Sequence, residues 1–380
     1  MLRGLILRLT GLTATGRVLR PRPGLSPQAA GLTEIADFGP NPGGLRMFVH
    51  VPARLSKAAP LVVVLHGCGQ TAAGYASGAG WRDVADRLGF VLLAPEQQNA
   101  NNMGGCFNWF QSGDNIRASG EAASIRQMIA HAVAGHDLDA RRIFVTGLSA
   151  GGAMTAVMLA TYPEIFAGGA IIAGLPYGSA ANVPEALNAM RHVRERSPEK
   201  WAEAVRGASA HAGPWPRLSI WHGDADTTVQ AGNAEALIAQ WTALHGLDLP
   251  PSQVEQGPAH VRRSWRGPDG KTALESYTLA GLGHGVPVHA GDGKTCCGQA
   301  GPFFIEAGLS STLQIAAFWG LSSPPVAVKK IVPARPRLLP QPIVPDAAPP
   351  AQTPEPVSEV AGVKGVILKA LQAAGLINKP

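Results

Sequence analysis

Residues 144–152 read FVTGLSAGG and contain a GxSxG motif centred on Ser149. An apolar run predicts a buried strand over residues 143–146, directly before the motif. After it, small apolar residues recur at helical spacing, namely Ala153, Ala156, Val157 and Ala160. A weakly nucleophilic serine needs such a strand, sharp turn and helix, because its hydroxyl must stand clear of the backbone beside a base and N–H donors. A chance GxSxG is credible among 46 glycines, but this context argues against it, and Ser149 is predicted to be a nucleophile.

An acid follows along the chain, in the order Ser, Asp, His that is typical of this motif. A predicted strand over residues 217–222 runs into HGDADTTV, which places Asp224 and Asp226 at the carboxyl end of a strand. Asp226 fits an HGxxDxxV arrangement, in which the carboxylate would orient a histidine and stabilise its imidazolium. Asp224 is the alternative, although a turn residue that accepts backbone hydrogen bonds is its simpler interpretation.

The candidate base is His284, which lies in GLGHG after a predicted strand over residues 273–280. Glycines on both sides let the backbone turn and present the imidazole to the serine. His289 is a competitor, but it lies beyond Pro287 and outside this glycine-rich turn. The remaining histidines are interpreted as structural or exposed.

An acyl-transfer site also needs donors for the oxyanion, and each missing donor costs roughly 3 to 4 kcal/mol. The predicted strand over residues 61–65 runs directly into HGCGQ, where one donor is expected. We expect the backbone N–H groups of Cys68 and Ala150 to supply the two hydrogen bonds. His66 and Gly67 would shape this loop, and Gly67 lets the backbone approach the substrate.

Several longer motifs identify a family. The segments NPGGLRMFVHVP, LVVVLHGCGQTAAGYA, GCFNWF, HGDADTTV and GLGHG together resemble the poly(3-hydroxybutyrate) depolymerase family of esterases, over about residues 33–320. The resemblance implies an α/β-hydrolase fold and a Ser149, Asp226, His284 triad that cleaves carboxylic esters through an acyl-enzyme without a metal or organic cofactor. It also implies poly(3-hydroxybutyrate) or another polyhydroxyalkanoate, or its oligomers, as substrate.

Two other functions stay open beside the polyester one. Relatives within the family act on feruloyl or acetylxylan esters, so either is an alternative substrate class. The alternative from another class is a catalytically silent binding protein that keeps the hydrolase fold. Such a scaffold would be expected to have lost one of Ser149, Asp226 and His284, whereas all three are present.

The net charge of +6 is concentrated in the two ends of the chain. Residues 1–32 hold five Arg and no acidic residue, and residues 321–380 hold seven Lys or Arg against three acidic residues. The part between them is therefore slightly acidic and indicates no basic groove for nucleic acid.

Apolar strands alternate with helical patterns along the chain, which predicts βαβ units and a mostly parallel central sheet flanked by helices. Residues 181–214 are charged and helical in pattern, and they form a candidate lid insertion between the strand after Ser149 and the strand before Asp226. The other predicted strands cover residues 45–51, 90–95 and 168–173, and the predicted helices cover residues 119–135, 150–162, 233–245 and 311–319.

Composition divides the chain into four parts. Residues 1–32 form a basic N-terminal segment that we expect to be poorly ordered, and residues 33–322 form the catalytic domain. Residues 323–360 form a Pro-rich linker, because proline density blocks helices and strands. Residues 361–380 carry one apolar stripe and predict a short amphipathic helix, which would dock on its own domain or on a surface.

The chain has four cysteines. The resemblance implies a disulfide between Cys68 and Cys106, and closing that ring would contribute about 3 to 4 kcal/mol in the chain-entropy model. Cys296 and Cys297 are adjacent, so they either bridge each other or remain thiols, and they lack the spacing of a zinc site. A disulfide favours an extracellular or periplasmic location. No clear signal peptide is visible and no transmembrane segment is predicted, so the cytoplasm is the alternative.

Candidates for substrate contact come from the loops around the predicted cleft. They are His66, Gly67, Asn108, Trp109 and Tyr177. Trp81 and the aromatic residues of GCFNWF also supply apolar surface, although ordinary core packing explains any one of them equally well.

Overall fold

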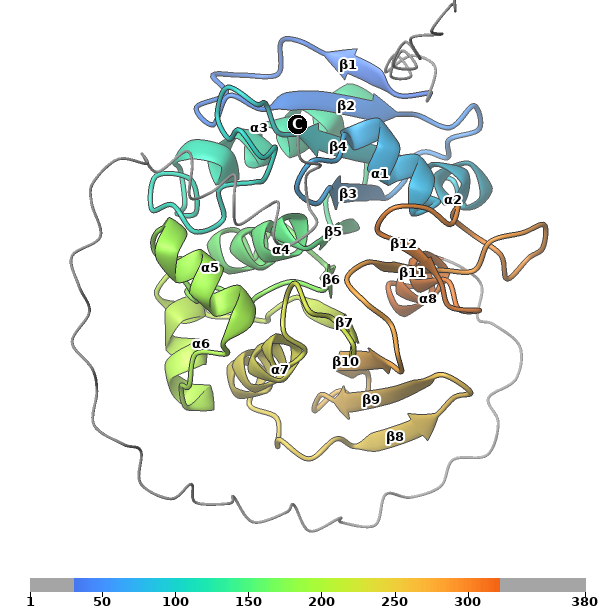
Figure 1. The fold of residues 1–380 in the computed structure, drawn as a ribbon. Helices are drawn as coiled ribbons and strands as arrows, with labels where there is room; N and C mark the ends of the chain where they lie inside the picture. Colours follow the sequence, from blue (N-terminus) through green and yellow to red (C-terminus); the bar gives the residue numbers. More distant parts are fainter. Residues whose placement is uncertain (1–30, 322–380) are drawn as a thin grey trace, which may run out of the picture.

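The apolar runs of the sequence form the centre of a ten-stranded sheet in the computed structural model, which describes residues 31–321. The strand order is β1-β2-β4-β3-β5-β6-β7-β10-β9-β8, and it can be followed from top to bottom in Figure 1. The strands are β1 (Thr33–Ile35), β2 (Arg46–His50), β3 (Leu61–Leu65), β4 (Val91–Glu96), β5 (Ile143–Leu148), β6 (Gly168–Ile172), β7 (Arg217–Gly223), β8 (Gln253–Gln256), β9 (His260–Arg266) and β10 (Thr272–Leu279). A separate parallel pair is formed by β11 (Val286–Val288) and β12 (Phe304–Glu306).

The middle of the sheet is parallel and its edges are antiparallel. Strands β4, β3, β5, β6, β7 and β10 pair in parallel, while β1 and β2 extend one edge and β9 and β8 the other in antiparallel fashion. The predicted α/β class with a mostly parallel sheet is therefore confirmed. Strands β1, β8, β9, β11 and β12 were not predicted from the sequence, because they are short or, like β9 with its three arginines, only partly apolar.

Helices cover both faces of this sheet (Figure 1). In the view drawn, α3, α4, α5, α6 and α7 lie on one side and α1, α2 and α8 on the other. The helices are α1 (Ala72–Gly78), α2 (Trp81–Leu88), α3 (Gly120–His136), α4 (Ala150–Thr161), α5 (Val183–Arg191), α6 (Pro198–Arg206), α7 (Gly232–His245) and α8 (Ser311–Phe318). Within residues 31–321, every helix and strand predicted from the sequence is present, within one or two residues at each end.

Each face of the sheet buries its own apolar core. In β3, Leu61, Val63 and Leu65 belong to the core that includes α3, α4 and α7, whereas Val62 and Val64 belong to the core that includes α1, α2 and α8. Side chains alternate between the faces of a strand, so a strand buried on both faces must be apolar throughout. This explains why LVVVL is an unbroken apolar run and not an alternating one.

Close backbone contact fixes α4 against the end of β3. A Cβ atom on Gly151 would overlap the carbonyl oxygens of Leu65 and His66, and one on Gly147 would overlap the backbone of Gly151. Both glycines of the GxSxG motif are therefore needed for packing, independently of chemistry. The contact brings the turn that follows β5 next to the loop that follows β3.

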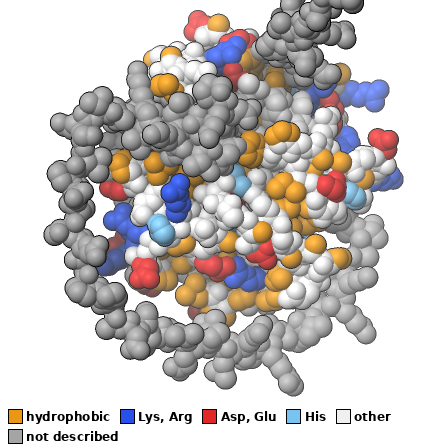
Figure 2. All heavy atoms as spheres, viewed as in Figure 1, with side chains coloured by type: hydrophobic (Ala, Val, Ile, Leu, Met, Phe, Trp, Pro, Cys, Tyr) orange, Lys and Arg blue, Asp and Glu red, His pale blue; other side chains and the backbone are white. Residues whose placement is uncertain are grey.

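Charged side chains of both signs share the face drawn in Figure 2, where Lys and Arg lie interspersed with Asp and Glu. Within residues 31–321, no helix is long and apolar enough to cross a membrane. Most of the basic N-terminal segment, the Pro-rich linker and the predicted C-terminal helix over residues 361–380 lie outside the described residues.

The substitution Gly151→Ala tests the close contact. We expect it to lower the free energy of unfolding by about 2 kcal/mol or more, because the added methyl group meets backbone atoms that cannot move aside. Gly135→Ala in α3 is the matched control: its Cβ meets open space, so it should stabilise the helix by roughly 0.5 to 1 kcal/mol. Urea unfolding of both variants measures the difference, and equal stabilities would contradict this description of the contact.

Candidate active site

Ser149 occupies the sharp turn between β5 and α4. Its backbone lies at φ 56° and ψ −118°, a combination that costs a non-glycine residue of order 1–3 kcal/mol. The surrounding structure holds it there, because the Ser149 N–H donates to the carbonyl oxygen of Ile172 at 2.9 Å and the Ser149 carbonyl accepts from Ala153 at 2.8 Å. The backbone of Ser149 is therefore fixed at the start of α4, and the residue lines the cavity described below.

Asp226 follows β7, and His284 follows β10, the parallel neighbour of β7. Parallel strands end at the same edge of a sheet, so residues 58 positions apart meet there. His284 Nδ1 donates to Asp226 Oδ2 at 2.7 Å. The other carboxylate oxygen, Oδ1, accepts from the N–H groups of Thr228 and Val229 at 2.8 and 2.9 Å.

The loops that carry these two residues are joined to each other by further hydrogen bonds. The Asp224 N–H donates to the carbonyl of Leu279, and the Ala225 N–H donates to the carbonyl of Leu282. The Asp224 carboxylate accepts from the Gly281 N–H at 2.6 Å. Asp224 thus acts as a turn residue, and Asp226 is the carboxylate that faces the histidine.

The Asp226 carboxylate stays ionised. Burial by itself would raise its pKa, but hydrogen bonds from His222 and His284 and the charge of His284 outweigh burial and hold the pKa of Asp226 well below its usual range. Any stability that this carboxylate contributes is present at neutral pH and is lost as the pH falls through its lowered pKa. A fixed negative charge is what a neighbouring imidazolium requires.

The second ring nitrogen of His284 remains for chemistry. Its Nε2 is buried and has no hydrogen-bond partner among residues 31–321. Because Nδ1 carries a proton toward Asp226, Nε2 bears the lone pair that can accept one. His289 is placed differently, since its backbone forms an isolated bridge with Cys297.

Two backbone N–H groups beside Ser149 fit the expected oxyanion donors. The N–H of Ala150 is the first of α4, and the first N–H groups of a helix have no intrahelical acceptor. In the loop after β3, Gly67 donates to the Gln70 side chain, Gly69 to the carbonyl of Gly104 and Gln70 to that of Gly67. These bonds use the N–H groups around Cys68 but not that of Cys68 itself.

A disulfide between Cys68 and Cys106 is present, which confirms the pairing implied by the resemblance. It links the loop after β3 to the loop after β4. In the described part of the chain, Cys296 and Cys297 are free thiols, so of the two alternatives for this pair the structure has the unbridged one.

Ser149, Ala150 and Cys68 open onto one cavity of about 470 Å³. Residues 99–104 and the aromatic rings of Trp109 and Phe110 form part of its wall. Helix α5 supplies another part through four side chains, Val183, Ala186, Leu187 and Met190. The wall is thus largely apolar, with amide side chains near residues 99–102.

Of the five candidates for substrate contact, Trp109 lines this cavity and the other four lie outside its lining. His66 is buried under the loop, where Nε2 accepts from the Gln97 N–H at 3.1 Å. Burial lowers the pKa of His66 to about 4, so the ring is neutral at pH 7. Gly67 belongs to the loop backbone, and the Tyr177 hydroxyl donates to the carbonyl of Asn115.

Asn108 belongs to a buried polar cluster that the sequence analysis missed. The Glu121 side chain, near the start of α3, accepts from the Asn108 N–H at 2.8 Å and from the Gln97 side chain. Gln97 also donates to the carbonyl of Cys106 at 2.9 Å. Burial raises the pKa of Glu121 to about 8, while these hydrogen bonds partly oppose that shift. A glutamate among the small apolar residues of GEAASI was the available signal.

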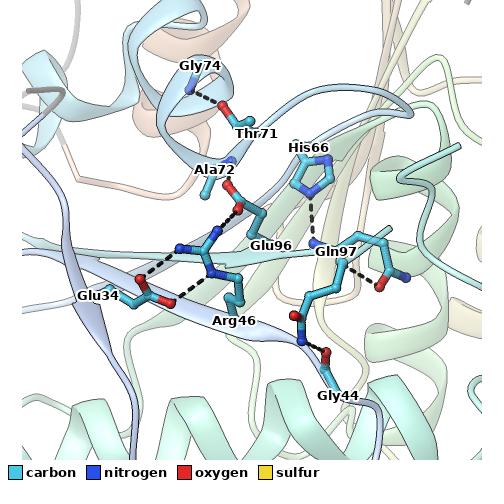
Figure 3. Close-up of polar contacts among 10 residues, drawn as sticks. Glu34, Gly44, Arg46, His66, Thr71, Ala72, Gly74, Glu96 and Gln97 are labelled. Atoms are coloured by element: carbon cyan, nitrogen blue, oxygen red, sulfur yellow. Dashed lines mark hydrogen bonds and ion pairs between the residues drawn. The ribbon is translucent and has the colours of Figure 1, made fainter. Parts of the chain in front are cut away.

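This cluster continues to the far side of the loop (Figure 3). The His66 ring meets the Gln97 N–H, and Glu96 accepts both from Arg46 at 2.7 Å and from the Ala72 N–H at the start of α1. Arg46 in turn forms two hydrogen bonds to Glu34. Gln97, directly after β4, therefore binds both loops that carry Cys68 and Cys106, and the neighbouring Glu96 links β4 to β2 and to the start of α1.

Trp81 belongs to the core and not to the site. It is fully buried in α2 and stacks on Trp319 at 5.7 Å between ring centroids. Within residues 31–321, no group of three or more His, Cys, Asp or Glu side chains is arranged to hold a metal ion.

Comparison with known proteins agrees with this geometry. A family model described as Esterase PHB depolymerase matches residues 46–253. The poly(3-hydroxyalkanoate) depolymerase C of Paucimonas lemoignei is 43% identical over 291 residues, which are 76% of this chain and 70% of that protein. The chain belongs to the PHB depolymerase family of esterases.

Two more relatives of this esterase carry other names. Feruloyl esterase B of Neurospora crassa is 33% identical over 283 residues, which are 73% of this chain and 94% of that protein. The solved structure of acetyl xylan esterase from Aspergillus awamori matches with a TM-score of 0.66 at 25% identity, over 77% of this chain and 99% of that one. The expected α/β-hydrolase fold and serine esterase class are therefore confirmed.

Asp226→Asn separates the two aspartates of the esterase. An asparagine amide would disfavour the Nδ1–H tautomer of His284 and remove the charge that stabilises its imidazolium, so we expect kcat to fall about 10⁴-fold. Asp224→Asn is the control, because Asp224 binds the Gly281 N–H, and its kcat should stay within about tenfold of the wild type. Comparable losses in both variants would contradict the assignment of Asp226.

Proposed function

We propose that this esterase hydrolyses poly(3-hydroxybutyrate), a related polyhydroxyalkanoate or its oligomers, through an acyl-enzyme on Ser149. The proposed reaction rests mainly on one observation. Ser149, Ala150 and Cys68 open onto the same cavity, and the Asp226–His284 pair lies at the edge of the sheet where the parallel strands end. The substrate class is supported by the largely apolar cavity wall and by the 43% identity to the Paucimonas lemoignei protein.

The residues have distinct roles in this mechanism. Ser149 Oγ attacks the ester carbonyl while His284 Nε2 takes its proton, and Asp226 stabilises the resulting imidazolium. The N–H groups of Cys68 and Ala150 bind the oxyanion. His284 then protonates the leaving alcohol oxygen, which leaves the acyl group on Ser149.

The second half of the reaction reuses the same groups. Water gives a proton to His284 and attacks the acyl carbonyl, and the oxyanion again receives the two backbone hydrogen bonds. Collapse of this intermediate returns the proton to Ser149 and releases the hydroxyacid. Each step moves protons between named side chains, so the proposed cycle calls for no cofactor.

A feruloyl or acetylxylan ester is the second candidate. The amide side chain of Asn99 at the cavity wall would suit a sugar hydroxyl better than a polyester chain, whereas the amides of Asn101 and Asn102 are already hydrogen-bonded to other groups of the protein. The catalytic groups would be the same for both substrates. The side chains of the cavity wall would therefore determine which substrate is preferred.

We further propose that residues 181–214 act as a lid. Helix α5 of this segment supplies the aliphatic side of the cavity, whereas α6 packs on α7 and buries Trp201. The disulfide beside the site also fits an oxidising compartment, and we propose an extracellular or periplasmic location on that ground.

The function is tested with wild type and Ser149→Ala on 3-hydroxybutyrate oligomers, a feruloyl ester and acetylated xylan. We expect hydrolysis that depends on Ser149, with the highest kcat/KM on the oligomers. A preference for the sugar-linked esters would support the same mechanism but would contradict the polyester as substrate. Serine-independent turnover would contradict the nucleophile, and a folded protein without any esterase activity would favour the silent binding protein.

Leu187→Trp tests the role of α5. A larger side chain at the cavity wall should narrow the cavity and lower kcat/KM on long oligomers at least severalfold more than on a dimer. Asn188→Trp, at the next and exposed position, is the matched control and should leave the length preference unchanged. Product analysis by chromatography measures it, and identical profiles for both variants would exclude α5 from substrate selection.

A further inference from the structure

His222 is a second histidine at the Asp226 carboxylate, and the mechanism above gives it no role. It lies near the end of β7 with a side chain that is 2% exposed. Its Nε2 is 2.8 Å from the carbonyl oxygen of Val229 and 3.4 Å from Asp226 Oδ2. Asp226 Oδ2 is also the oxygen that accepts from His284 Nδ1. Two imidazoles from neighbouring strands therefore face one carboxylate oxygen.

The Val229 carbonyl fixes the proton of His222 on Nε2. A carbonyl oxygen can only accept, so the nitrogen 2.8 Å away must donate. The opposite nitrogen, Nδ1, is buried and lacks a hydrogen-bond partner in the described part of the chain, so a proton there would have no acceptor. His284 has the opposite tautomer, with its proton on Nδ1. His222 is thus a donor at this site, while His284 is the proton acceptor.

The hydrogen bond of His222 closes the turn that carries the acid. Val229 donates its N–H to Asp226 Oδ1 at 2.9 Å and accepts from His222 through its carbonyl. Val229 also lines the cavity. One residue therefore connects the carboxylate, His222 and the substrate space, and loss of the His222 donor would free one side of this turn.

The charge at Asp226 is shared between the two rings. Within residues 31–321, His222 from β7 and His284 from the loop after β10 are the titratable side chains in contact with its carboxylate, and the Asp224 carboxylate is bonded instead to the Gly281 N–H. The His222 Nε2–H is hydrogen-bonded to the Val229 carbonyl, but Nε2 lies 3.4 Å from Oδ2, close enough for the N–H to attract part of the negative charge there. Removal of this N–H would leave that charge to the His284 imidazolium alone.

We propose that His222 is a positioning residue of this esterase: its Nε2–H holds the turn over residues 226–229 so that Asp226 faces His284, and it shares the charge of Asp226 Oδ2. The inference rests on the triad of the proposed function. A packing role predicts instead that any side chain of similar size can replace His222.

Two substitutions separate these roles. His222→Gln keeps an N–H donor at about the distance of Nε2, whereas His222→Leu fills space without a donor. With 4-nitrophenyl butyrate as substrate, we expect His222→Leu to lower kcat about tenfold with little change in KM, since loss of one intramolecular hydrogen bond is at most of this order. The midpoint of the acid limb of the pH–rate profile should move up by about half a pH unit, because the undivided carboxylate charge stabilises the His284 imidazolium. His222→Gln should restore most of both effects.

Equal kcat losses for the Gln and Leu variants with an unmoved midpoint would overturn the proposal in favour of packing. Wild type and Ser149→Ala are assayed in parallel, so failure of the proposed function would show separately, as the absence of serine-dependent turnover. Should the variants unfold, ¹⁵N-histidine NMR of the wild-type protein provides the test. An Nε2–H tautomer at His222 is expected, and an Nδ1–H tautomer would contradict the proposal.

Discussion

The close backbone contact between the end of β3 and the start of α4 is the constraint on which the rest of the site depends. Neither Gly147 nor Gly151 has room for a Cβ atom. The turn between them therefore requires glycine at both positions. That turn holds Ser149 in a strained conformation and leaves the Ala150 N–H at a helix start. The same contact places the loop with Cys68 next to the serine, so packing and the proposed catalysis depend on the same few atoms.

Buried polar groups form the second layer of support. The Asp226 carboxylate has partners for both oxygens, and Glu121 binds the two segments that carry Gln97 and Asn108. Unpaired buried polar groups are costly, so each of these networks fixes one arrangement of its loops. The Cys68–Cys106 disulfide adds a covalent link between the two loops at the cavity. These contacts fix the site on the side of β3 and β4, while α5 supplies an aliphatic part of the cavity wall.

Much of this could be predicted from the sequence because it depends on local patterns. The apolar run LVVVL, the GxSxG turn and the glycine-flanked His284 each have a local physical reason, and each lies in the predicted element. Contacts between distant segments were harder to predict. Glu121 accepts a hydrogen bond from Asn108 because the fold brings α3 next to the loop after β4. No residue spacing in the sequence predicts this contact.

The candidates for substrate contact show the same limit. His66 and Asn108 lie in the right loops, but the His66 ring binds the Gln97 N–H and Asn108 Oδ1 accepts from the Asn102 and Gln111 side chains, whereas Trp109 lines the cavity. Residues 181–214 were predicted as a lid, but the individual aliphatic residues of α5 gave no signal, because an apolar position on an amphipathic helix predicts burial and not a substrate wall. Tertiary packing sets the direction in which a loop side chain points. The composition of the chain and the spacing of its motifs do not reveal that direction.

The residue that a covalent inhibitor modifies tests the Ser149, Asp226, His284 triad most directly. The protein is treated with a fluorophosphonate, digested and analysed by mass spectrometry, with Asp226→Asn treated in parallel. We expect a single adduct on the peptide that contains Ser149, formed much more slowly in the variant. An adduct on another residue, or labelling of Ser149 at the same rate in both proteins, would contradict a triad built on Ser149, Asp226 and His284.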